Sequence, residues 1–475
     1  MAKEKETVNI DNFKSTADLT NNPGFQSSLS IASKDVTDDK PYNPFEHRNL
    51  EHPNSTVGSV VHLLKACLGT GILAMPSAFK NAGLLMGIIG TLIAGFLCTH
   101  TVAMLVAASQ KICVIMKKPA LSYAETCGAV CTYGPKRIQS WGPTVTVIMD
   151  YSLVVTYFSV LCVYVVFIGS SLKEVMDVYA PGSLSIQAYC ALTLVPLVLI
   201  CQIRNLKYLV PFSGCANVML LVVICITSYY VFSDLPSIED RDLVAGIGTW
   251  PLFLSTVVFA MEGIGLVMPV ENEMKNPKRF LGCPGVLNTA MIIVIGLFVV
   301  MGFFGYLQFG DEAKGSVTLN LPEDAILAQL TKLLMALVIF FSYALQFYVP
   351  MEMITRTRKG RECKHENLIQ VAIRTVLVTA TVAVAAAFPN LELVISFTGA
   401  VFFSTLGLLI PVLVDTAYHW DRGLGPCGYI LLKNIIIGII SIIVLFSGAI
   451  VSLLQMIEEF GGGHENQESL NATLT

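Results

Sequence analysis

Residues 57–79 read VGSVVHLLKACLGTGILAMPSAF, an apolar run that contains the flexible tripeptide Gly69-Thr70-Gly71. A second apolar run, WPLFLSTVVFAMEGIGLVMPV over residues 250–270, contains Glu262-Gly263-Ile264-Gly265. A helix in a bilayer must satisfy its own backbone hydrogen bonds, so a flexible break persists only where protein or a water-filled cavity surrounds it. Breaks at corresponding places in two halves of a membrane protein indicate the binding site of a transporter. We therefore predict a binding site at these two breaks.

The composition is that of a membrane protein. The chain has 475 residues, of which 54% are hydrophobic and 13% are charged, and its mean hydropathy is +0.66. A soluble protein of this length would carry about 25% charged residues. The apolar residues also fall in runs of about 20, the length that crosses a hydrocarbon core. The sequence therefore predicts an all-α integral membrane protein with about eleven transmembrane helices. The expected spans are 57–79, 84–107, 144–169, 187–202, 209–232, 250–270, 285–307, 326–350, 370–388, 392–414 and 429–454.

The chain is predicted to hold one membrane domain, residues 56–455, between two tails. Residues 1–55 are rich in Asn, Ser, Thr and Asp and lack the apolar stretch of a signal peptide, so we expect a disordered tail there. Residues 456–475 form a short C-terminal tail. The net charge of −4 is divided among loops and gives no indication of nucleic-acid binding.

The distribution of Lys and Arg predicts how the chain crosses the membrane. Lys and Arg are plentiful in the N-terminal tail and in every second loop, and the remaining loops are acidic. Because cytosolic loops carry the excess of Lys and Arg, the N-terminus is expected in the cytosol. An odd number of spans then places the C-terminus outside the cell or in an organelle lumen. There Asn471, in Asn-Ala-Thr, is a glycosylation candidate, whereas the sequon at Asn54 stays cytosolic and unmodified.

The thirteen cysteines are predicted to be buried thiols rather than disulfides or metal ligands. The expected spans contain Cys67, Cys98, Cys162, Cys190, Cys215 and Cys225, and five further cysteines lie in loops that we place in the reducing cytosol. Cys127 and Cys131 are four residues apart, but no second Cys or His pair at zinc spacing lies nearby. No metal site is therefore expected.

Ionisable side chains inside spans are costly, so each is a candidate for function. His62 lies seven residues before Gly69, which on a continuous helix places both on nearly one face, about 10 Å apart along the axis. Histidine changes charge near neutral pH, as proton coupling requires, although a histidine there can equally serve a structural hydrogen bond. Glu262, at the second break, can bind a proton, a substrate ammonium or sodium, or can accept hydrogen bonds from freed amides. Lys332 is expected to reach the membrane interface with its amine, and Lys65 to do the same from the inner end of its own span.

The first break can bind a substrate without any side chain. Unwinding at Gly69 and Gly71 frees backbone amides, and the N-terminus of a half-helix attracts a carboxylate, while freed carbonyls attract an ammonium. The alternative is that these small residues only allow close helix packing. The sequence contains no catalytic triad, zinc signature or phosphate loop, and its Gly-rich break does not follow a strand, so we expect no enzyme activity and no cofactor.

Several segments resemble the proton-coupled amino-acid transporters of the amino acid/auxin permease group. The resemblance covers residues 57 to 455. The segments that carry it are HLLKACLGTGILAMPSAFKNAG (His62–Gly83), EGIGLVMPVENEMKNPKRF (Glu262–Phe280), YLQFG (Tyr306–Gly310), TLNLP (Thr318–Pro322) and YALQFYVP (Tyr343–Pro350).

This resemblance implies a LeuT-type fold, in which spans 1–5 and 6–10 form an inverted 5+5 repeat with one extra C-terminal helix. It implies symport of small neutral amino acids, such as alanine, glycine and proline, with protons as the coupling ion. It also assigns roles to individual residues. Proton coupling falls to His62 and Glu262, and the substrate site to Gly69, Thr70, Gly71, Ala260, Glu262 and Gly263, with Tyr343 and Phe347 lining the pocket.

The chain departs from the family pattern at two places. Ala66-Cys67 stands where Gly-Asn is expected, and the loss of the amide can change affinity, ion use or substrate range. The loop after Pro322 lacks the cysteine of vertebrate members, so the resemblance is to an insect-like member and no luminal disulfide is predicted.

Two other functions stay open at this stage. One is an amino-acid sensor that reports to cytosolic growth-signalling partners with little bulk transport, and the other is a sodium-coupled symporter. Family members occur at the plasma membrane and at lysosomes or late endosomes. Tyr42-Asn43-Pro44-Phe45 in the N-terminal tail matches both a Tyr-based sorting signal and an Asn-Pro-Phe endocytic motif, so endocytic partners are a further expectation.

Overall fold

The computed structural model describes residues 42–48, 53–182, 184–233, 235–261, 263–358 and 365–473. Within these ranges the protein is helical, and the only extended pairing is an isolated parallel bridge between Asn54 and Met274. The helices of the bundle are α3 (Thr56–Cys67), α4 (Thr70–Ala82), α5 (Leu84–Met116), α6 (Tyr123–Thr132), α7 (Gly142–Tyr179), α8 (Ile186–Leu192), α9 (Leu194–Cys201), α10 (Leu206–Phe232), α11 (Trp250–Ala260), α12 (Ile264–Asn272), α13 (Val286–Phe309), α14 (Ile326–Arg358), α15 (Glu366–Ala387), α16 (Leu391–Thr398), η9 (Gly399–Leu409), α17 (Ile410–His419) and α18 (Tyr429–Thr473).

The described residues contain nine helices long and apolar enough to cross a membrane, or ten if the bent pair α3–α4 is one span. The prediction of an all-helical membrane protein is confirmed. Ten of the eleven expected spans correspond to these helices. The expected fourth span, 187–202, corresponds to the shorter apolar stretch Ile186–Cys201, which holds α8 and α9.

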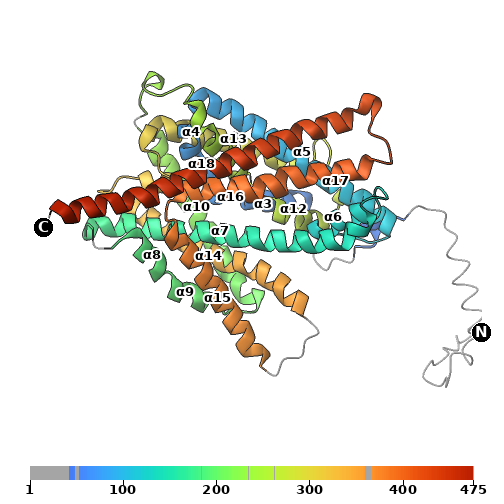
Figure 1. Cartoon of the computed structure of the whole chain (residues 1–475), viewed down its shortest axis with the longest axis horizontal. Coiled ribbons are helices and arrows are strands. Elements are labelled where there is room, and N and C mark those ends of the chain that lie inside the picture. Colours follow the sequence, from blue (N-terminus) through green and yellow to red (C-terminus); the bar gives the residue numbers. More distant parts are fainter. Residues whose placement is uncertain are drawn as a thin grey trace, which may run out of the picture.

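Long helices cross the whole molecule and define its two ends. In Figure 1, α7 and α18 run from one end to the other, with α6 near one end and α8 near the opposite end. α18 packs against η9, a π-helix that joins α16 to α17 and also contacts α11. We call the end that holds Glu271 the Glu271 face and the end that holds Glu392 the Glu392 face.

Helix α4 lies at the centre of the bundle. Twelve of its thirteen residues are buried, and Lys80 is the exception. A helix that is apolar on all sides is stable only when neighbours cover it completely. Here α11 and α13 cover α4, and the glycines of α13 allow the approach, since a Cβ at Gly305 would lie 2.4 Å from Pro76. The helix that follows the first break is therefore part of the protein core.

Both predicted tails contain ordered structure where they are described. Residues 42–48 form a turn with the short helix η2 (Pro44–Glu46), in which the Asn43 side chain accepts a hydrogen bond from the Phe45 amide. Pro44 is buried. Helix α18 continues beyond residue 455 to Thr473. Residues 1–41 and 49–52 of the predicted N-terminal tail lie outside the described residues.

The cysteine prediction is confirmed in part. Among the described residues no cysteine forms a disulfide, and seven are buried, from Cys67 to Cys201. The prediction of burial is wrong for four cysteines that are exposed, Cys215 and Cys225 on α10 and Cys283 and Cys427 in connections, and Cys131 is only half-buried. A span in lipid is apolar both where it meets the protein and where it meets the membrane, so hydrophobicity does not distinguish these two sides.

Candidate functional site

Two helices are interrupted where the sequence contains its Gly breaks. The first break lies between the end of α3 at Cys67 and the start of α4 at Thr70, and the chain bends there by 50°. The second lies between the end of α11 at Ala260 and the start of α12 at Ile264. Gly69 and Gly263 precede the second half-helix in each case, and neither supplies a capping side chain. Among the described residues, the first-turn amides of α4 and α12 therefore have no side-chain cap.

The two breaks are in direct contact. A Cβ added to Gly71 would lie 2.8 Å from Cα and 2.9 Å from the carbonyl oxygen of Ala260. On the other side, a Cβ added to Gly263 would lie 3.7 Å from Sγ of Cys67. Gly71 thus allows α4 to approach the backbone of α11, and Cys67 of α3 lies beside the start of α12. The structure thus brings together two pairs of distant residues, Gly71 with Ala260 and Cys67 with Gly263, which are 189 and 196 positions apart in the chain.

Most of the predicted substrate residues lie at this junction. Thr70, Gly71, Ala260 and Gly263 are buried, and Gly69 is half-buried. Glu262 lies outside the described residues, but its neighbours Met261 and Gly263 both belong to the second break. The junction is therefore made mainly of backbone and small side chains, with little side-chain chemistry of its own.

His62 lies on α3, five residues before its end, and is exposed. The face that α3 buries carries Ser59, Leu63 and Cys67 instead. His62 and Gly69 do not lie on one continuous helix as predicted, because α3 ends at Cys67 and the chain bends before α4. Lys65 is also exposed. The role of His62 in proton coupling stays a prediction.

Tyr343 and Phe347 lie on α14 and are fully buried. The Tyr343 hydroxyl is hydrogen-bonded to the Thr381 hydroxyl of α15 at 2.7 Å, and the two aromatic rings stack at 6.3 Å between centroids. Phe347 also packs edge-on against Phe158 of α7. These contacts join α14 to α7 and α15, so the two side chains can line a substrate pocket only if this packing opens.

At the Glu271 face, a buried carboxylate of α12 is held by residues from distant segments. One guanidinium N of Arg48 lies 3.1 Å from Oε2 of Glu271, and the two side chains are 4% and 2% exposed. Arg48 also donates to the backbone carbonyls of Glu271 and Pro119, and Gln110 of α5 donates to Oε1 of Glu271 at 2.9 Å. We call Arg48, Gln110 and Glu271 the Glu271 cluster. It fixes residues 42–48 to the end of α12.

At the Glu392 face, the end of α4 is bound to the start of α16. Nζ of Lys80 lies 2.9 Å from Oε2 of Glu392 and donates to the Ala313 carbonyl at 2.9 Å. The Asn81 amide donates to Oε1 of Glu392 at 2.6 Å. We call Lys80, Asn81 and Glu392 the Glu392 cluster. Both clusters therefore hold a half-helix at the end that lies away from its break.

The half-helices are also joined in pairs at those same ends. The Lys275 amide after α12 donates to the carbonyl of Asn54, just before α3, at 2.9 Å. At the opposite face, the Ala245 amide before α11 donates to the carbonyl of Ala82, the last residue of α4, at 2.8 Å. The chain thus forms one pair from α3 and α12 and a second pair from α4 and α11, and the pairs meet at the two breaks.

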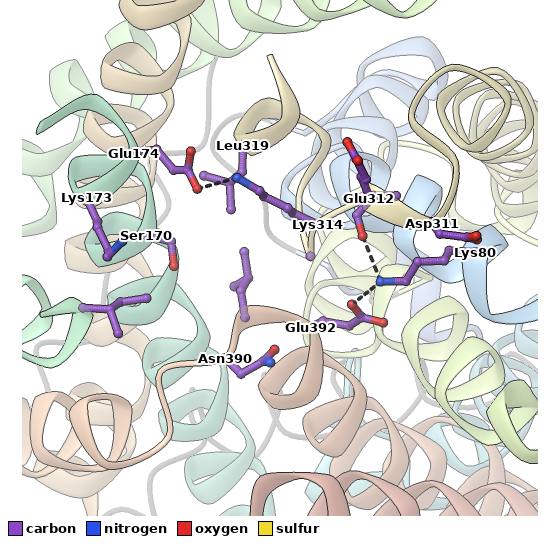
Figure 2. A pocket seen from close by; sticks show the side chains of 14 residues that line it. Lys80, Ser170, Lys173, Glu174, Asp311, Glu312, Lys314, Leu319, Asn390 and Glu392 are labelled. Atoms are coloured by element: carbon purple, nitrogen blue, oxygen red, sulfur yellow. Dashed lines mark hydrogen bonds and ion pairs between the residues drawn. The ribbon is translucent and has the colours of Figure 1, made fainter. Parts of the chain in front are cut away.

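A cavity of about 540 Å³ opens beside the Glu392 cluster. Figure 2 shows two ion pairs on its two sides, Lys80 with Glu392 and Lys314 with Glu174, with Ser170 and Asn390 in the wall. The remaining lining residues are Lys173, Ile186, Asp311, Glu312, Ala313, Gly315, Leu319 and Leu391. The cavity is therefore lined by charges of both signs and by small or apolar side chains.

The prediction for Lys332 is wrong. Its side chain is 0% exposed, and Nζ lies 3.7 Å from Oε2 of Glu174 instead of reaching an interface. The Glu271 and Glu392 clusters were not predicted at all. Glu271 could have been identified from the sequence, because a carboxylate directly after an apolar run is costly in a membrane protein. Arg48 and Lys80 are not distinguished in the sequence from the other Lys and Arg residues outside the spans.

The described residues contain no group of three or more His, Cys, Asp and Glu side chains arranged to hold a metal. Cys127 and Cys131 lie on α6, and burial raises the pKa of the Cys127 thiol to about 12. A thiol binds metal as the thiolate, so this pair has the wrong surroundings for a ligand.

Comparison with known proteins supports the prediction of a transporter, which the paired breaks also support. Residues 52–455 match the family described as "Transmembrane amino acid transporter protein". This chain belongs to that family. The chain is 38% identical over 419 residues to "Proton-coupled amino acid transporter-like protein pathetic" from Drosophila melanogaster, an alignment that covers 88% of this chain and 89% of the relative. It is also 30% identical over 299 residues to "Vacuolar amino acid transporter 4" from Saccharomyces cerevisiae, covering 62% of this chain and 39% of the relative.

The resemblance to proton-coupled amino-acid transporters is thereby confirmed, including the likeness to an insect protein. The matched region contains both breaks and the Glu271 and Glu392 faces, except for Arg48, which lies just before it. The residues at the junction and in the two clusters are therefore the ones whose role in an amino-acid transporter has to be explained.

Proposed function

We propose that the protein is a proton-coupled symporter of small neutral amino acids of the alanine, glycine and proline class, working by alternating access on a LeuT-type fold. The observation that carries the proposal is the contact of the two breaks, Gly71 on Ala260. Uncapped amides at the start of α4 suit a substrate carboxylate, and carbonyls at the ends of α3 and α11 suit its ammonium. The name of the Drosophila relative supports protons as the coupling ion.

The pairing of the half-helices supports alternating access. If the pair α3–α12 moves, the Glu271 face opens, and if the pair α4–α11 moves, the Glu392 face opens. Each movement breaks one cluster: Arg48 must leave Glu271 in the first case, and Lys80 must leave Glu392 in the second. Both clusters are formed in this structure, and we propose that it corresponds to the state in which both faces are closed over the junction. We assign the Glu271 face to the cytosol, because the distribution of Lys and Arg predicts that the N-terminal segment, which contacts Glu271, lies there.

We predict that proton coupling depends on His62. The amino-acid-evoked current measures this dependence. Alanine should evoke an inward current that is larger at about pH 5.5 than at about pH 7.5, because a lower external pH supplies more protons to drive symport. The current should not need sodium. His62→Ala should abolish the acid stimulation, whereas His365→Ala, which removes another exposed histidine at the start of α15, should preserve it.

The outcomes of this experiment separate the alternatives. A current that requires sodium and ignores pH would contradict proton coupling and establish sodium symport. Alanine binding without current or uptake would establish a sensor. An unchanged acid response in His62→Ala would move proton coupling to another group, with Glu262 as the next variant to measure.

A sensor function is a second candidate because the N-terminal segment is attached to a half-helix. Residues 42–48 contact α12 through Arg48, so opening of the Glu271 face would release a segment that cytosolic signalling or endocytic partners can bind. The Asn43-Pro44-Phe45 turn is folded against the body in this state. Residence in a lysosomal membrane, in the plasma membrane or in both is proposed on the family resemblance and on the vacuolar name of the yeast relative.

A further inference from the structure

We propose that the cavity at the Glu392 face is a second amino-acid-binding site, in which Lys314 binds the carboxylate and Glu174 binds the ammonium of the ligand. The ligand class rests on the proposed function. The cavity of about 540 Å³ is larger than a small amino acid, and its wall carries three lysines and four carboxylates. A ligand that suits such a wall carries one charge of each sign at short separation and a small side chain. A zwitterionic amino acid has this composition.

The Lys314–Glu174 pair is the one available to a ligand. Lys80 and Glu392 are fully engaged, since Lys80 also binds the Ala313 carbonyl and Glu392 also accepts from Asn81. Nζ of Lys314 contacts Oε1 of Glu174 at 2.6 Å, and the two side chains are 45% and 22% exposed. An ion pair that is partly exposed to water contributes little to stability, so a ligand that replaces each partner with its own opposite charge loses little.

Lys332 prepares Glu174 for this exchange. Its amine is fully buried, forms no hydrogen bond among the described residues and lies 3.7 Å from Oε2 of Glu174, beyond hydrogen-bond distance. When Lys314 turns to a ligand carboxylate, Lys332 still supplies a positive charge beside Glu174. Glu174 therefore keeps one positively charged neighbour while its carboxylate accepts the ligand ammonium. Structural packing alone gives no reason for a buried lysine amine without a hydrogen bond at this place.

An amino acid that enters from the Glu392 face would meet the cavity before it meets the first break. Lys80, in the cavity wall, lies ten residues after Thr70 on α4, which is about 15 Å along the helix axis. An amino acid that arrives at the Glu392 face meets the cavity first and must pass the Glu392 cluster to reach the junction. The site would thus collect substrate while both faces are closed.

The test measures how many alanine molecules bind to the purified full-length protein. Equilibrium dialysis with labelled alanine at saturating concentration should give two molecules per chain for the wild type, and one for Lys314→Gln and for Glu174→Gln. Lys173→Gln should still give two, because this lysine lines the same cavity but is paired with Asp177 on its own helix. Uptake should continue in Lys314→Gln with a KM raised several-fold.

Other outcomes overturn the site. One molecule per chain in the wild type, unchanged in Lys314→Gln, would contradict the cavity site and leave the proposed function intact. Two molecules in both proteins would place the second ligand elsewhere. No binding and no uptake in the wild type would overturn the proposed function together with the site. Monodisperse elution of every variant shows that a loss of binding is not a loss of fold.

Discussion

Gly71→Ala is expected to abolish most amino-acid uptake while the protein still reaches its membrane. The added Cβ would lie 2.8 Å from Cα and 2.9 Å from the oxygen of Ala260, and both are backbone atoms that cannot rotate away. α4 and α11 must therefore separate by about half an ångström or more. Overpacking of this kind costs about 1–3 kcal/mol. Because the displaced atoms form the junction itself, we expect initial uptake to fall at least about tenfold.

The measurement is the initial rate of labelled alanine uptake, divided by the amount of protein at the membrane. Gly71→Leu should be more severe than Gly71→Ala, since a longer side chain enlarges the same clash. Gly296→Ala is the matched control, because Gly296 lies within helix α13 and nothing lies within 4 Å of its added Cβ. Replacing a glycine in a helix by alanine stabilises it by roughly 0.5–1 kcal/mol where space permits. Normal uptake by Gly71→Ala would show that the two half-helices need no close contact for transport.

The breaks could be predicted from the sequence because their signal is local. A glycine pair in an apolar run of about 20 residues is costly in a bilayer unless the fold uses it. Gly71 and Gly263 were found in this way. What they touch was not predictable, because the contact of Gly71 with Ala260 depends on how α4 and α11 pack, and periodicity carries no information on packing partners that are 189 residues apart.

The charged clusters could not be predicted for a related reason. Arg48 lies in a polar stretch whose composition predicts disorder, and its partner Glu271 is 223 residues away. Lys332 was recognised as a charge in a span, but its surroundings were assumed to be lipid interface and are protein. His62 was correctly placed on the half-helix before the break, yet its relation to Gly69 was derived from a helix that ends between them. Local patterns thus identified residues that matter, and tertiary packing decided their contacts.

The second large effect is expected when the Glu271 cluster is broken. Arg48→Gln leaves the carboxylate of Glu271, which is 2% exposed, without its counter-charge. Removal of one partner from a buried ion pair costs about 3–5 kcal/mol, and this cost applies only while the Glu271 face is closed, because an open face exposes the carboxylate to water. The variant should therefore populate the state that is open at the Glu271 face.

The thiol of Cys67 reports on that opening. Cys67 is buried at the end of α3 beside Gly263, so a reagent reaches it only when α3 and α12 move. In a protein whose other twelve cysteines are replaced by serine, a membrane-impermeant maleimide added at the Glu271 face should label Cys67 at least about tenfold faster in Arg48→Gln. Every ~1.4 kcal/mol shifts an equilibrium tenfold, so the expected cost exceeds what this change requires. Glu273→Gln should label like the parent, since Glu273 is exposed and, among the described residues, its carboxylate accepts from the Asn54 side chain, a hydrogen bond that the glutamine oxygen can still accept.

The double variant Arg48→Gln with Glu271→Gln decides whether charge or mere attachment controls the opening. With both charges removed, no uncompensated charge is left in the closed state, and two amides can still bind one another and Gln110. If the cluster acts through its charges, the double variant should label Cys67 more slowly than either single variant, and the coupling of the two substitutions should be strongly non-additive. If the effects simply add, Arg48 only anchors residues 42–48 to the body. Closure of the Glu271 face would then depend on the backbone pairing of Asn54 with the segment after α12, and substitutions that disturb this pairing should open it instead.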